Sequence, residues 1–184
     1  MIRLENVKKT YKKATLSYPN IEINAPYALL IGQNGSGKTT LLKAISNLIH
    51  YQGTIHRSVK CLFSEENPHF PEDMIVKEYL SIIQELTRLT SLNRFNQLLK
   101  IFELNDHLDK PFKALSKGMR QKVHLTQTLM IPKQLYLLDE PTSGLDQTAL
   151  KQLVNWLKDE SAQILISTHT PDIFSKLNPY EIRL

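Results

Sequence analysis

The segment Gly32-Gln33-Asn34-Gly35-Ser36-Gly37-Lys38-Thr39 fits the phosphate-loop pattern GxxxxGKS or GxxxxGKT. It follows an apolar run at residues 27–31 that suits a buried parallel strand, and it precedes residues 38–49, whose apolar side chains, Leu48 included, recur at helical spacing. With glycine at an ordinary ~7% of residues, a chance match is on the order of 1% or less. We therefore reject a plain glycine-rich turn and predict a strand, a phosphate loop and a helix.

The loop offers the groups that a nucleoside triphosphate requires. Its glycines let successive backbone N–H groups point at phosphate oxygens, and the N-terminal end of the following helix adds a positive field. Lys38 can reach the β- and γ-phosphates, and the Thr39 hydroxyl can bind Mg²⁺. The candidate nucleotide contacts are Gln33, Asn34, Gly35, Ser36, Gly37, Lys38, Thr39 and Thr40.

Two adjacent carboxylates, Asp139 and Glu140, follow a second apolar run at residues 135–138. Acids at the carboxyl end of a central strand emerge beside a phosphate loop in parallel-sheet proteins. Asp139 is suited to hold Mg²⁺ through its water shell, and Glu140 is suited to orient and deprotonate an attacking water. Alone, the pair could equally be a solvated acidic turn, but the phosphate loop favours the catalytic interpretation.

Length and composition predict one soluble domain. The chain has 184 residues, and its apolar stretches fall well short of the ~20 residues that span a bilayer. The start lacks the features of a secretory signal, and Cys61 has no partner for a disulfide. We therefore expect the protein to reside in the reducing environment of the cytoplasm. The net charge is +5, with one basic cluster at Lys8, Lys9, Lys12 and Lys13, but the other cations are scattered and we expect no nucleic-acid partner.

Hydrophobic periodicity predicts an α/β fold. We expect strands at 2–8, 54–57 and 59–63, helices at 74–89 and 92–104, and then helix 117–130, strand 134–139, helix 147–159 and strand 162–167. This order favours a mostly parallel sheet flanked by helices, with a small antiparallel β lobe and a short helical insert. We predict a single domain, 1–184, with residues 1–65 and 115–184 as the catalytic core and 66–114 as a helical subdomain. The first inserted helix should bury Ile82 and Leu86 along its apolar face.

The segments that link these motifs resemble the ATP-binding subunits of ABC transporters, a family of P-loop NTPases. Residues 115–121, LSKGMRQ, resemble the ABC signature in a form common among exporter ATPases. Residues 141–146, PTSGLD, resemble the D-loop with its Asp146, and residues 167–169, STH, resemble the H-loop. Tyr11 stands where the family places an aromatic that stacks on adenine. The motifs occur in the family's order from Tyr11 to His169, which covers most of the chain.

The resemblance implies a site shared by two copies of the chain. ATP and Mg²⁺ would bind between the phosphate loop of one copy and Ser116 and Gly118 of the other, with His169 near the γ-phosphate and Glu140. Each motif also has an ordinary structural interpretation. Ser116 would be a helix N-cap in any protein, and Asp146 could belong to a simple turn before a helix. Tyr11 could pack only within its strand.

One position departs from the family pattern. Many relatives carry a glutamine that touches Mg²⁺ between the phosphate-loop lobe and the helical insert, whereas this chain has Ser64-Glu65-Glu66-Asn67 there. Glu66 is the best match to the family's glutamine, and Glu65 takes that place if the alignment is shifted by one residue. A carboxylate still offers Mg²⁺ an oxygen ligand but adds negative charge beside the phosphates.

The sequence therefore predicts an ATPase that dimerises around two ATP molecules and drives a separately encoded membrane permease, most simply an exporter. We expect it to be cytoplasmic and peripheral on the inner face of the cell membrane. The alternative is a soluble ABC-type ATPase that acts on DNA or ribosomes, although neither a heptad tract nor a second motif set is present. A nucleotide-binding regulator without turnover is a third possibility, which the presence of Glu140 and His169 disfavours.

Overall fold

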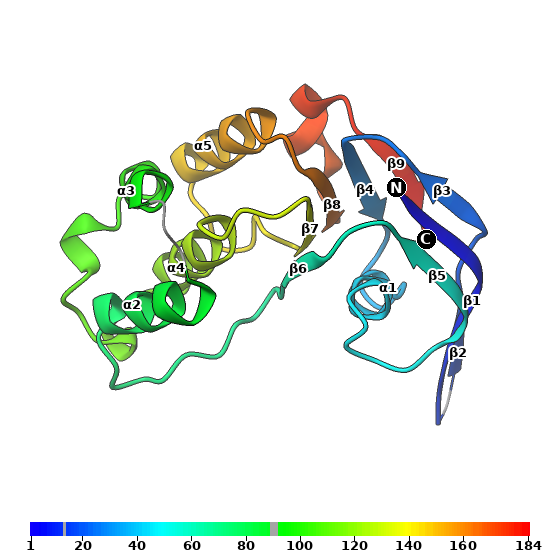
Figure 1. The fold of residues 1–184 in the computed structure, drawn as a ribbon, viewed down its shortest axis with the longest axis horizontal. Helices are drawn as coiled ribbons and strands as arrows, with labels where there is room; N and C mark the ends of the chain where they lie inside the picture. Colours follow the sequence, from blue (N-terminus) through cyan, green and yellow to red (C-terminus); the bar gives the residue numbers. More distant parts are fainter. Residues whose placement is uncertain (13, 89–91) are drawn as a thin grey trace. The chain divides into compact units, whose positions relative to one another are not determined.

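The chain divides into two compact units, and the first (Met1–Glu65, Lys133–Pro141 and Lys158–Leu184) contains a five-stranded parallel sheet (Figure 1). The computed structural model describes residues 1–12, 14–88 and 92–184, so Lys13 of the basic cluster and Leu89 of the first inserted helix lie outside the described residues. The strand order is β6-β7-β8-β4-β9, and every neighbouring pair runs parallel. The strands are β4 (Tyr27–Ile31), β6 (Cys61–Ser64), β7 (Leu135–Asp139), β8 (Gln163–Thr168) and β9 (Tyr180–Arg183).

A second, antiparallel sheet is built around β1. Strand β1 (Ile2–Tyr11) pairs with β2 (Ala14–Ser17), β3 (Ile21–Ile23) and β5 (Gln52–Arg57), and all three pairings are antiparallel. The alternating burial of β1 leaves Ile2, Leu4 and Val7 inside, as expected for a strand with one face on a core. The predicted α/β fold, with a parallel sheet and a small antiparallel lobe, is confirmed.

Helix α1 (Lys38–Ile45) packs between the two sheets (Figure 1). Its Leu41, Leu42 and Ile45 join one apolar core with residues of β1, β4, β7 and β8. Burial of side chains of this kind contributes about 1.5–3 kcal/mol each. The helix that follows the phosphate loop is therefore fixed from both sides.

The helix after the phosphate loop is shorter than predicted. It ends at Ile45 and not at residue 49, because Asn47 takes a left-handed backbone conformation with φ of 62°. The helical periodicity placed Leu48 in the core, but this side chain is 61% exposed. The turn lifts it out of the apolar face that Leu41 and Ile45 continue.

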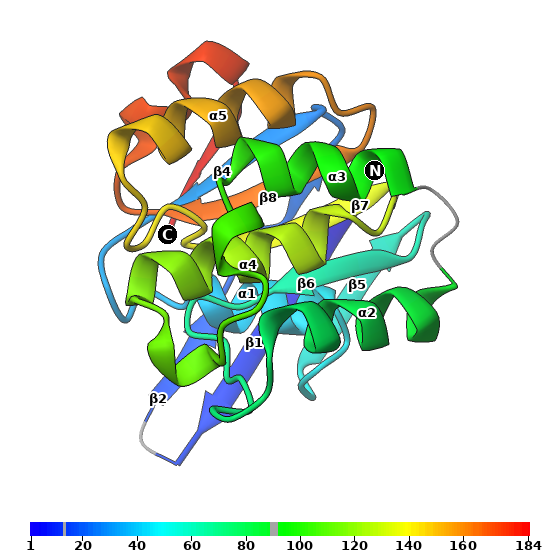
Figure 2. The ribbon, with the colours of Figure 1, turned by 90° about the vertical axis from the view of Figure 1, so that its left-hand side faces the viewer.

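Most of the remaining helices belong to a second compact unit, Glu66–Pro132 and Thr142–Leu157, whereas both sheets and α1 lie in the first. These helices are α2 (Val76–Thr87), α3 (Leu92–Ile101), α4 (Lys117–Leu129), α5 (Gln147–Lys158), and the short 3-10 helices η1 (Asn105–His107), η2 (Phe112–Ala114) and η3 (Pro171–Leu177). Of these, η3 and the last residue of α5 fall in the first unit. Helix α4 packs against both α2 and α3 (Figure 2). The predicted subdomain 66–114 lies inside this unit together with α4.

The apolar face of α2 is narrower than predicted. Val76 and Leu80 are fully buried, but Ile82 is 43% exposed and Leu86 is 74% exposed. The last turn of α2 therefore contributes little to the core. Among the described residues, every helix is too short or too polar to serve as a transmembrane span.

Candidate active site

The carboxyl ends of β4, β7 and β8 are level with one another. Asp139 of β7 pairs in register with Ser167 of β8, and Thr168 pairs with Ile31 of β4. The phosphate loop follows Ile31 directly, so this register brings the loop, the two carboxylates and the segment up to His169 to one edge of the sheet. The chain segments involved all belong to the first unit.

The phosphate loop is shaped by two glycines with positive φ. Gly35 has φ of 86° and Gly37 has φ of 99°, a region that other residues enter only at a cost. Gly37 is the N-cap of α1, and no side chain caps this helix end. The N-terminus of α1 thus keeps its unpaired N–H groups and positive dipole for an anion. Gln33, Asn34 and Thr39 are exposed around it.

Lys38 is held inside the loop. Its side chain is 6% exposed, and its ammonium donates to the carbonyl oxygens of Gly32 at 2.7 Å and Gln33 at 3.3 Å. The same nitrogen lies 3.5 Å from Oε1 of Glu140. The lysine is therefore a fixed positive charge between the loop and the carboxylate, at the position where a phosphate would be recognised.

Asp139 and Glu140 are both organised by Ser167, which the sequence did not single out as a site residue. The Ser167 hydroxyl donates to Oδ1 of Asp139 at 2.5 Å and accepts from the Glu140 N–H at 3.0 Å. Asp139 is 1% exposed, so its charge depends on such partners. The sequence offers one hint, a serine directly after the apolar residues Ile164, Leu165 and Ile166, but its alignment with Asp139 comes from strand register.

Glu140 sits in a strained conformation between Lys38 and His169. Its φ of 43° is left-handed, which is uncommon for a residue with a side chain and is often found at functional sites. Oε2 lies 3.0 Å from Nδ1 of His169, and Oε1 faces Lys38. Glu140 is 6% exposed, whereas the His169 side chain is 60% exposed. The predicted residues Lys38, Glu140 and His169 are thus brought into one cluster.

The residues at this edge fit a phosphate and a hard cation. The buried hydroxyl of Ser36 has no hydrogen-bond partner within the parts of the chain that the structure describes, which suits an oxygen-rich ligand. Thr39 and Asp139 provide the hydroxyl and the carboxylate that commonly hold Mg²⁺ together with substrate phosphates.

Tyr11 is the last residue of β1 and contacts the phosphate-loop helix. Its hydroxyl is 3.3 Å from Oγ1 of Thr40, and its ring is 49% exposed. The ammonium of Lys9 lies 5.3 Å from the ring centroid. An exposed ring tied to the phosphate-loop helix is available for stacking on a purine base.

The pairing of β6 with β7 helps to place Glu65 and Glu66, the two carboxylates in the segment where many relatives have a glutamine. Ser64 pairs with Leu138, so the next residue, Glu65, is level with Asp139. Glu65 is the last residue of this segment in the first unit, and Glu66 belongs to the second unit. Both side chains are partly exposed.

The signature segment in the second unit begins α4. Ser116 is the N-cap of this helix, and its hydroxyl accepts from the Met119 N–H at 3.2 Å. Gly118 is in close contact with Gly144, since a Cβ at Gly118 would lie only 2.4 Å from the Gly144 carbonyl oxygen. A glycine is required at 118 because any side chain would force the turn before α5 to move.

Asp146 links the two segments that the resemblance identified. Its Oδ1 accepts from the Ala149 N–H at 2.8 Å, and its Oδ2 lies 2.8 Å from Nζ of Lys122 in α4. The hydrogen bond with Lys122 holds the pKa of Asp146 below its usual range. Ser116 is thus a helix N-cap, and Asp146 lies in the turn before α5, where it accepts from an N–H of that helix; both arrangements are compatible with nucleotide contact through the exposed end of α4.

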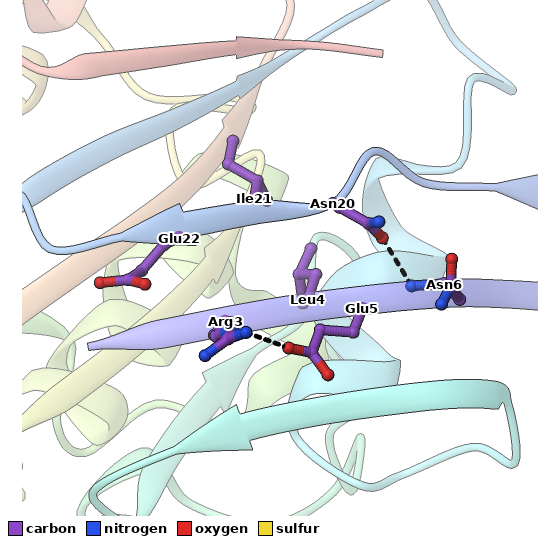
Figure 3. A pocket seen from close by; sticks show the side chains of 7 residues that line it. All are labelled: Arg3, Leu4, Glu5, Asn6, Asn20, Ile21 and Glu22. Carbon is purple, nitrogen blue, oxygen red and sulfur yellow. Dashed lines mark hydrogen bonds and ion pairs between the residues drawn. The ribbon is translucent and has the colours of Figure 1, made fainter.

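A hollow of about 470 Å³ lies elsewhere, along β1 and β3 of the antiparallel sheet (Figure 3). Two pairs of its lining residues bond with one another: Arg3 pairs with Glu5, and the Asn6 N–H donates to Oδ1 of Asn20 at 2.6 Å. None of the predicted site residues lines it.

Comparison with known proteins gives a consistent result. The family described as ABC transporter matches residues 21–143. The uncharacterized ABC transporter ATP-binding protein YthP of Bacillus subtilis is 34% identical over 95% of this chain and 78% of its own length. The lantibiotic transport ATP-binding protein SrtF of Streptococcus pyogenes is 31% identical over 92% of this chain and 80% of its own length. A solved structure of an ATP-binding subunit of an ABC transporter has the same fold, with a TM-score of 0.82, 24% identity and coverage of 96% of this chain and 82% of its own.

Proposed function

The chain belongs to the ABC transporter family as an ATP-binding subunit with ATPase activity, and from that premise we propose that it powers an exporter whose permease is a separate polypeptide. The observation that carries the proposal is the cluster at the phosphate loop, in which Glu140 lies 3.5 Å from Lys38 and 3.0 Å from His169. A regulator that only binds ATP has no need of a positioned base of this kind.

We assign the reaction to these residues as follows. Lys38 and the N–H groups of the loop bind the phosphates of ATP, and Glu140 orients the attacking water and accepts its proton. His169 holds the Glu140 carboxylate by its contact with Oε2. Thr39 and Asp139 would hold Mg²⁺, which neutralises charge on the transferred phosphoryl group.

Two copies of the chain complete each site in this proposal. Phosphoryl transfer is favoured where water is excluded. Because the phosphate loop lies at an edge of the sheet, a second surface has to pack over it to exclude water. The N-terminal end of α4, with Ser116 and Gly118 and no acidic residue in its first turn, suits the γ-phosphate. Two-fold symmetry would then place two ATP molecules between two copies.

Export is the direction that we propose. The signature LSKGM resembles the form common among exporter ATPases, and the relative SrtF is a lantibiotic transport protein. The subunit would lie at the cytoplasmic face of the membrane, where the permease and ATP meet. The soluble alternative, action on DNA or ribosomes, has no comparable support from these relatives.

Reconstitution with the permease tests this function. We expect a reading frame next to the gene to encode a protein with about six apolar 20-residue stretches, and we expect its product to co-purify with this chain. In proteoliposomes whose ATPase subunits face the medium, an exporter should accumulate a lanthionine-containing peptide in the lumen when Mg²⁺ and ATP are added. Release of the peptide from preloaded vesicles would indicate import, and co-purification with ribosomes in place of a permease would favour the alternative.

The two carboxylates after β6 should differ in their effect on metal handling. The family spacing points to Glu66 as a Mg²⁺ ligand, but strand register puts Glu65 level with Asp139. We therefore expect Glu65→Gln to raise the Mg²⁺ concentration for half-maximal ATPase activity by about fivefold, equivalent to ~1 kcal/mol, with a smaller change in Glu66→Gln. Metal titrations of the two variants and the wild type check this. The reverse order would assign the metal contact to Glu66.

A further inference from the structure

Tyr18 connects the antiparallel lobe to the phosphate loop. It follows β2, it is 7% exposed, and its backbone N–H donates to the Val7 carbonyl at 2.9 Å. Its hydroxyl donates to the carbonyl oxygen of Gly37 at 3.0 Å. The sequence motifs gave this residue no role.

The partner of Tyr18 is the glycine on which the loop geometry depends. Gly37 combines a φ of 99° with the N-cap position of α1, and its carbonyl also accepts from the Leu41 N–H at 2.9 Å. A Cβ at Gly37 would lie 2.8 Å from the Tyr18 hydroxyl and 3.0 Å from Cδ1 of Leu16. The lobe therefore presses directly against this turn of the loop.

A fixed carbonyl at Gly37 also fixes the next N–H. In a planar trans peptide the C=O and the following N–H point in opposite directions. When Tyr18 and Leu41 hold the Gly37 oxygen on the side of the lobe and the helix, the Lys38 N–H is aimed away from them, toward the open side of the loop. That N–H is one of the groups available to a phosphate oxygen.

We propose that Tyr18 is a positioning residue for ATP binding, which orients the Gly37–Lys38 peptide of the phosphate loop through its hydroxyl. It acts in the free protein, so it reduces the ordering that the loop undergoes when ATP binds. Burial raises the pKa of Tyr18 to about 12, which keeps the hydroxyl protonated, and able to donate, throughout the physiological range. The role concerns nucleotide affinity and is independent of which substrate the permease carries.

The variant Tyr18→Phe keeps the buried ring and removes the hydroxyl. We expect the Kd for ATP, and KM with it, to rise about fivefold, as for the loss of one hydrogen bond. The kcat should change by less than about twofold, because Glu140 and His169 have other partners. Amide hydrogen exchange in the nucleotide-free protein should become faster at residues 38–40.

Tyr27→Phe is the matched control. Tyr27 begins β4, at the end opposite to the loop, and its hydroxyl donates to the Lys158 carbonyl at the same distance of 3.0 Å. Both variants should lower the thermal midpoint slightly, but only Tyr18→Phe should weaken ATP binding. The proposal is wrong if the two variants bind ATP equally well, or if Tyr18→Phe lowers kcat while Kd and hydrogen exchange stay at the wild-type values.

Discussion

Replacement of Glu140 by glutamine should nearly abolish ATP hydrolysis and leave ATP binding intact. The amide keeps the size of the side chain but cannot accept the proton of the attacking water. Loss of a general base lowers turnover by about 10²–10⁴-fold. Binding should change little because Lys38 retains two carbonyl partners in the loop, at 2.7 and 3.3 Å. Phosphate release and calorimetric titration with ATP measure the two quantities separately.

Glu181→Gln is a suitable control for this variant. Glu181 is an exposed carboxylate on β9 whose partner is Arg183 at 2.8 Å, so its neutralisation changes the net charge equally without touching the site. It should hydrolyse ATP at the wild-type rate. Turnover of Glu140→Gln within threefold of that rate would remove Glu140 from the chemistry and leave the Asp139 carboxylate as the next candidate.

The site residues that could be predicted from the sequence are those that belong to short contiguous motifs. The phosphate loop and the adjacent acids Asp139 and Glu140 each follow an apolar run, and parallel strands put such ends together. The roles of Ser167 and Tyr18 could not be predicted in the same way. Both contacts join segments far apart in the chain, Ser167 to Asp139 and Tyr18 to Gly37, and they depend on strand register and on the path of the β lobe.

The sequence pattern also failed to predict where α1 ends and which apolar side chains of the helices are exposed. Leu48, Ile82 and Leu86 each occur at helical spacing, yet all three are exposed. Periodicity reports which side chains share a face, but burial requires a neighbouring element to cover that face. A left-handed Asn47 moves Leu48 off the face altogether, and a single asparagine is only a weak signal for such a turn.

In the proposed function, the N-terminal end of α4 from a second copy covers the phosphate loop. This arrangement leads to a prediction about Ser116. The Ser116 hydroxyl caps α4 through the Met119 N–H, so a substitution that removes the cap would confuse loss of the helix end with loss of a nucleotide contact. Asparagine and aspartate are N-caps about as good as serine. They are also similar in size, and only aspartate carries a negative charge.

In the background of Glu140→Gln, where ATP persists, Mg²⁺ and ATP should produce a dimer that size-exclusion chromatography with light scattering detects. Adding Ser116→Asn should leave much of this dimer, whereas adding Ser116→Asp should abolish it, because a carboxylate would face the triphosphate across a site with little water to screen the charges. Monomeric ATP binding should be the same in both variants, since the phosphate loop is unchanged. If Ser116→Asp retains both the ATP-dependent dimer and, with Glu140 restored, the wild-type turnover, then α4 does not complete the site of a second copy.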